Sequence, residues 1–207
     1  LLKKDPDIEI HVAGHSAGSI LLGPLVKELS KFTTISTCSL WAPACTVDLF
    51  KKYYLPQLKG SDQAIREFAL YTLSDKAERD DNTGKIYNKS LLYLVANALE
   101  AEFHPLRWGW HGMPLLGMDR FVKADSELKG LFKDKAASHS LAPNSSSGKK
   151  GSRATSHGAF DDDTSTVKGT IARILGSSKS ASHLNFASSA ARSERIRHSL
   201  PKTGGND

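Results

Sequence analysis

"IEIHVAGHSAGSILLGPL", residues 8–25, is the stretch that decides the fold. Apolar and polar residues alternate at its start, and this pattern predicts a strand over residues 9–12. The small-residue segment GHSAG (14–18) follows, and the apolar stretch over 17–29 then predicts a helix. A serine between two glycines therefore lies where a strand becomes a helix. This position requires a physical explanation.

The turn around Ser16 has the Gly-x-Ser-x-Gly spacing of a nucleophile elbow. A serine that projects from the end of a strand adopts a positive φ, and such strain, about 1–3 kcal/mol, persists mainly at functional sites. Because the turn packs tightly between strand and helix, Gly14 and Gly18 are expected to be required as very small residues. The helix that begins after Ser16 directs free backbone N–H groups towards a reacting oxygen. The alternative is a tight Gly-Ser-Gly turn without chemistry.

The composition suggests that part of the chain does not fold, since only 39% of its 207 residues are hydrophobic. Its net charge of +6 lies in two Ser-rich segments, 134–155 and 176–207, each of which carries +3. Solvated, mobile chain is the preferred interpretation of both segments. Binding of nucleic acid or an anionic membrane is the alternative, but we expect no nucleic-acid partner. No apolar run is long enough to span a bilayer.

Two cysteines and the amino terminus bear on the compartment. Cys38 and Cys45 lie in apolar surroundings without metal-ligand neighbours, so we expect buried reduced thiols and no metal site. No leader is visible, which favours a cytoplasmic location. The chain begins at Leu1, however, and a missing beginning would hide such a segment.

Strands alternate with helices along the first 175 residues, which predicts an α/β fold with a mostly parallel sheet and flanking helices. Further strands are predicted over 32–43 and 65–75, and helices over 46–58, 85–103 and 164–175, the last with Asp163 as its N-cap. We therefore expect one domain over 1–175, with 134–155 as a mobile basic loop. Residues 176–207 are predicted to be a disordered tail.

A serine nucleophile needs a base that an acid orients, and both should follow later strands of the sheet. Asp75 directly follows the strand "FALYTLS" and is the preferred acid. Asp80 and Asp81 lie further along the same turn and are alternatives. Each could instead be a solvated turn carboxylate.

Eight histidines compete for the role of base. His157 lies in the tight turn "SHGAF" just before the last predicted helix, and we expect it to be the base. The other candidates lie on the first strand, beside the serine and pointing away from it, in an aromatic loop, or in low-complexity chain: His11, His15, His104, His111, His139, His183 and His198.

Together the "GHSAGS" elbow, the acid after a later strand and the late histidine resemble the carboxyl-terminal half of an α/β-hydrolase, over roughly residues 5–175. The His-x-Ser form of the elbow is similar to that of lipases and esterases. The resemblance implies that Ser16 attacks an ester carbonyl, His157 relays the proton and Asp75 holds His157. It also implies that the Ala17 N–H supplies half of the oxyanion hole. A small-molecule ester is the expected partner, and no cofactor is expected.

The sequence departs from that family at its start. In α/β-hydrolases the elbow strand is the fifth of eight, and the second oxyanion donor comes from an upstream loop. We therefore expect a four-stranded piece that lacks its amino-terminal strands and exposes a sheet edge, which favours aggregation. The alternative functions are a non-catalytic interaction protein with a truncated hydrolase fold, and an acyltransferase of the same fold.

Overall fold

The computed structural model describes residues 8–60, 63–81, 91–96 and 112–177. Within these ranges four strands form one parallel sheet in the order β1-β2-β3-β4. The strands are β1 (Ile10–His15), β2 (Ile35–Trp41), β3 (Ile65–Leu73) and β4 (Ala137–Ala142). The predicted α/β class and parallel sheet are confirmed.

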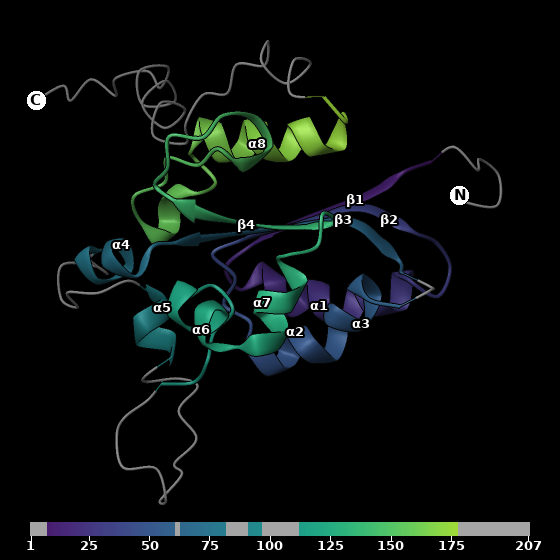
Figure 1. The fold of residues 1–207 in the computed structure, drawn as a ribbon, viewed down its shortest axis with the longest axis horizontal. Helices are drawn as coiled ribbons and strands as arrows, with labels where there is room; N and C mark the ends of the chain where they lie inside the picture. Colours follow the sequence, from purple (N-terminus) through teal and green to yellow (C-terminus); the bar gives the residue numbers. More distant parts are fainter. Residues whose placement is uncertain (1–7, 61–62, 82–90, 97–111, 178–207) are drawn as a thin grey trace, which may run out of the picture.

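Helices cover both faces of this sheet. They are α1 (Gly18–Leu29), α2 (Val47–Tyr53), α3 (Leu55–Leu58), α4 (Asp75–Asp80), α5 (Leu91–Leu94), α6 (Asp119–Ala124), α7 (Ser126–Leu131) and α8 (Thr164–Ile174). Figure 1 shows α8 on one face and α1, α2, α3 and α7 on the other, with α4 beyond one end of the strands. No helix within the described ranges is long and apolar enough to cross a membrane.

The central strands β2 and β3 are buried on both faces because helices cover each side. Their apolar side chains pack against those of the helices, and Phe68 of β3 lies 5.5 Å from Phe50 of α2 between ring centroids. This agrees with the burial on both faces that the β-branched and apolar stretch 32–43 predicts. The strand that leads to Ser16 is different, because none of its residues is fully buried.

Strand β1 is an edge strand, and among the described residues it pairs with β2 alone. Beside it, α1 exposes the apolar side chains of Ile20, Leu21 and Leu25, of which Leu21 is 76% exposed. The expectation that a four-stranded sheet leaves the serine-bearing strand at an edge agrees with this arrangement.

The prediction that residues 134–155 form a mobile loop is wrong, because this segment contains β4 and a short 3₁₀ turn at Gly148–Lys150. Strand β4 has the sequence "ASHSLA", in which apolar and polar residues do not alternate regularly, so it lacks the pattern that marks a strand. It pairs with β3 along one side, and the buried Arg173 of α8 donates to the Ser138 hydroxyl. His139, which we assigned to low-complexity chain, is half-buried and bonds Thr72 through Nε2 at 2.8 Å.

Other expectations are confirmed or lie outside the described ranges. The helix predicted over 46–58 is divided into α2 and α3, with Pro56 in the first turn of α3. Asp163 caps α8 through the N–H groups of Ser165 and Thr166, as predicted. Both cysteines are free and buried, and burial raises the pKa of each thiol. Residues 178–207 of the tail, residues 104–111 of the aromatic loop and most of the predicted helix 85–103 lie outside the described residues.

Two glycines offer a matched test of the packing. A Cβ at Gly117 would lie 2.4 Å from the Pro43 carbonyl oxygen, whereas a Cβ at Gly130 in α7 would meet nothing within 4 Å. We expect Gly117→Ala to lower the free energy of unfolding by about 1–3 kcal/mol through overpacking. Gly130→Ala is expected to raise it by about 0.5–1 kcal/mol through helix propensity. Urea unfolding measures both, and equal effects would contradict this packing.

Candidate functional site

Ser16 occupies a strained turn between β1 and α1, with φ at +51°. Hydrogen bonds hold both its backbone N–H and its carbonyl. The Ser16 N–H donates to the Trp41 carbonyl at 2.9 Å, and the Ser16 carbonyl accepts from the Ala44 N–H at 3.0 Å and from the Ser19 hydroxyl at 2.7 Å. Such a conformation persists only where the surroundings over-determine it. The positive φ expected at this serine is therefore present.

The two glycines of the elbow have different roles. A Cβ at Gly14 would lie 2.5 Å from Cδ1 of Leu22, so a side chain there would displace α1 or its leucine. A Cβ at Gly18 would meet nothing within 4 Å. The expectation that both positions must be very small is therefore wrong for Gly18, because the first residue of α1 faces open space.

His157 lies beside Ser16, although 141 residues separate them in the chain. It begins a 3₁₀ turn at His157–Ala159, directly before α8, and is 5% exposed. Its Nε2 lies 2.9 Å from Ser16 Oγ. A serine hydroxyl can donate to a neutral imidazole or accept from it, and the first arrangement, with the proton on Nδ1, is the one that a base at Nε2 requires. The structure brings together the predicted nucleophile and the predicted base.

Burial sets the protonation of His157 and lowers its pKa to about 4. A charge on His15 lowers this pKa further, whereas the carboxylates of Asp81 and Asp161 raise it. The imidazole is therefore neutral at pH 7, with Nε2 ready to accept a proton. Its Nδ1 is buried and has no hydrogen-bond partner among the described residues.

The three candidate acids differ in their contacts. Asp81 follows α4, and its Oδ2 accepts the backbone N–H of His157 at 2.9 Å. Asp75, the preferred acid, accepts from the Tyr93 hydroxyl at 2.9 Å and pairs with Arg79 at 2.7 Å. Asp80 is exposed. Among the described residues, Asp81 is thus the candidate whose carboxylate bonds to His157.

His15 contacts His157 at its carbonyl, whereas Asp81 contacts its N–H, and the sequence analysis missed this contact of His15. Its Nε2 donates to the His157 carbonyl at 2.9 Å, and the two ring centroids lie 5.3 Å apart. The ring, which the sequence analysis expected only to point away from Ser16, contacts the backbone of the candidate base. Asp161, whose charge also acts on His157, was likewise not considered.

The start of α1 supplies backbone donors beside Ser16. Because the first N–H groups of a helix have no intrahelical acceptor, those of Ala17 and Gly18 are free for another oxygen. Ala17 is exposed. This arrangement fits the expected oxyanion donor at Ala17.

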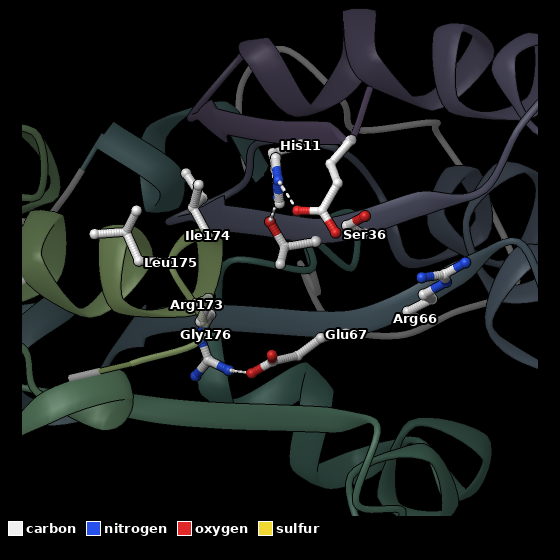
Figure 2. Close-up of a pocket in the computed structure, with 10 residues that line it drawn as sticks. His11, Ser36, Arg66, Glu67, Arg173, Ile174, Leu175 and Gly176 are labelled. Carbon is white, nitrogen blue, oxygen red and sulfur yellow. Dashed lines mark hydrogen bonds and ion pairs between the residues drawn. The ribbon is translucent and has the colours of Figure 1, made fainter. Parts of the chain in front are cut away.

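A separate polar cleft of about 460 Å³ lies among the amino-terminal halves of β1, β2 and β3 and the end of α8, as Figure 2 shows. Two pairs of its side chains contact each other. His11 lies 3.3 Å from Glu9, and the buried Arg173 pairs with Glu67. Neither Ser16 nor His157 lines this cleft, so we do not assign it to the same chemistry.

Comparison with models of known protein families, with curated proteins and with solved structures found no match to this chain. The functional argument therefore depends on the geometry around Ser16. Four of the remaining histidines, His104, His111, His183 and His198, lie outside the described residues.

Ser19 provides a test of how the elbow is held. Its buried hydroxyl donates to the Ser16 carbonyl and accepts from the Cys45 N–H at 3.0 Å. Ser19→Ala leaves that N–H buried without an acceptor, and we expect a loss of about 1–3 kcal/mol in the free energy of unfolding. Ser30→Ala removes a surface bond to Lys27 and should change it by less than about 0.5 kcal/mol. Equal midpoints in urea would contradict the role of Ser19.

Proposed function

We propose that this chain is a serine hydrolase of the α/β-hydrolase type that cleaves a carboxylic ester through an acyl-enzyme intermediate. The observation that carries the proposal is the 2.9 Å contact between Ser16 Oγ and His157 Nε2 at a turn with positive φ. A hydroxyl becomes a useful nucleophile when a neutral imidazole stands within hydrogen-bond reach.

In the first step, Ser16 Oγ bonds to the ester carbonyl carbon while its proton passes to His157 Nε2. The N–H of Ala17 stabilises the negative oxygen that forms. The tetrahedral intermediate then expels the alcohol, which takes the proton from His157. Water repeats the sequence on the acyl-enzyme, releases the acid and restores Ser16.

We assign Asp81 as the carboxylate that stabilises the charged imidazole of His157. Its negative charge raises the pKa of His157 and so stabilises the proton that His157 gains. Its Oδ2 also holds the His157 backbone. A carboxylate has two oxygens, and the second can accept the unpartnered Nδ1–H when the ring becomes charged. Asp75 remains the alternative from the sequence, although Tyr93 and Arg79 occupy its carboxylate.

The proposal includes further strands beyond the free edge of β1, as in the family that the sequence resembles. The one-sided pairing of β1 and the exposed apolar face of α1 support this part. The same two features also favour the alternative of a non-catalytic interaction protein. Acyl transfer to an alcohol other than water uses the same residues.

Labelling by a fluorophosphonate probe tests the proposal, because the probe reacts with activated serines. Wild-type protein should label, and Ser16→Ala should not. Asp81→Asn should slow labelling about 10²–10⁴-fold, whereas Asp75→Asn should slow it less than about tenfold. Circular dichroism controls for folding. Folded wild-type protein that does not label would contradict the enzyme and leave the interaction protein.

The pH profile of labelling tests the assignment of the base. Because burial lowers the pKa of His157 to about 4, the imidazole loses its proton above that pH and becomes a base. The labelling rate constant should therefore reach half its maximum near pH 4 rather than near 6.5. Asp81→Asn removes a charge that raises this pKa, so the half-point should move lower. A half-point near 6.5 in folded protein would show that the base is a solvated histidine.

A further inference from the structure

Hydrogen bonds hold both backbone groups of His157, its N–H and its carbonyl. On the amino side, its N–H donates to Asp81 Oδ2 at 2.9 Å. On the carboxyl side, its carbonyl accepts from His15 Nε2, also at 2.9 Å. The two contacts fix the backbone from which the imidazole extends to Ser16.

His15 differs from Asp81 in where it comes from. It is the last residue of β1 and the immediate neighbour of Ser16. The residue next to the nucleophile therefore also bonds to the residue that provides the base, 142 positions later in the sequence. Any displacement of the 3₁₀ turn at His157–Ala159 away from β1 would have to break this bond.

Packing reinforces the contact. The His15 ring lies 5.3 Å from the His157 ring and 6.4 Å from that of Phe160, a fully buried residue at the end of the same turn. A carbonyl oxygen only accepts, so the bond requires a proton on Nε2 of His15. The orientation of His15 is thus determined by its packing and by the hydrogen bond together.

The separation of nucleophile and base has a large effect on rate, since a displacement of about 1 Å can cost about 10²-fold. We propose that His15 is a positioning residue that holds His157 against Ser16 by donating its Nε2–H to the His157 carbonyl. The inference rests on the proposed function for its kinetic consequence. The hydrogen bond itself can be tested without activity.

Nitrogen-15 NMR of the histidine rings in wild-type protein at pH 7.5 tests the bond directly. His15 should be found with its proton on Nε2 and His157 with its proton on Nδ1. A proton on Nδ1 of His15 with a bare Nε2 would overturn the proposal, because no donor would face the carbonyl. This result decides the role of His15 even if the wild-type protein does not label, which would overturn the proposed function alone.

Three variants test the kinetic consequence with the fluorophosphonate probe. His15→Phe keeps an aromatic ring against His157 but removes the donor, and it should lower the maximal labelling rate about 10–100-fold with unchanged probe affinity. His15→Gln offers an amide donor and should stay within about threefold of wild type. His11→Phe is the matched control on the same strand, where His11 bonds Thr37 instead, and its rate should not change.

The outcomes separate positioning from a general loss of structure. A His15→Phe rate equal to that of wild type would overturn the proposal, as would a His15→Gln rate as low as that of His15→Phe. A lowered rate in His11→Phe equal to that in His15→Phe would also overturn it, because the effect would then belong to β1 as a whole.

Discussion

The hydrogen bond from the Ser16 N–H to the Trp41 carbonyl is the contact on which the rest of the site depends. It fixes a residue with positive φ to the end of the neighbouring strand. The next strand end repeats the arrangement, since Ala42 also has positive φ, +40°, and its N–H donates to the Tyr71 carbonyl at 2.8 Å. Two adjacent turns at the carboxyl edge of the sheet therefore each contain a non-glycine residue with positive φ.

The same edge continues across the sheet, where the Ser74 N–H donates to the Ala142 carbonyl at 2.9 Å. At each of these strand ends, a backbone N–H just after one strand donates to a carbonyl near the end of the neighbouring strand. Strand β4 then leads into the segment that returns His157 to Ser16. These backbone bonds thus connect the turn at Ser16, through β2 and β3, to β4, and the segment that carries His157 follows β4.

The interior around His157 has two opposing effects. Burial keeps the imidazole neutral, which a base requires, but it leaves Nδ1 without a partner. An unpaired buried donor costs about 1–3 kcal/mol. The Asp81 carboxylate stabilises a charged imidazole more than a neutral one, so under the proposed function it would favour the protonated state that His157 reaches when it accepts the serine proton.

The sequence predicted those parts of the fold whose signal is local. The elbow, the apolar strands β2 and β3 and the Asp163 cap of α8 each depend on neighbouring residues. Strand β4 was missed because its sequence has no regular apolar alternation, and it is held as a strand by pairing with β3 and by the contact of Ser138 with Arg173.

The candidate acid could not be chosen from the sequence for a related reason. Asp75 lies two residues after the end of β3, but Ser74 caps a six-residue helix there and Asp75 is the first residue of that helix. The helix carries the chain onward, so Asp81, the residue after it, bonds to His157. A short helix of this kind leaves no apolar periodicity by which it could be recognised.

The order of the strands along the sheet follows their order along the chain. A nascent polypeptide can therefore pair β1, β2 and β3 before residue 157 is synthesised. Ser16 would then already sit on its turn, yet its hydroxyl would meet no imidazole until residue 157 had arrived. Reactivity at this serine would thus record the completion of folding, not its beginning.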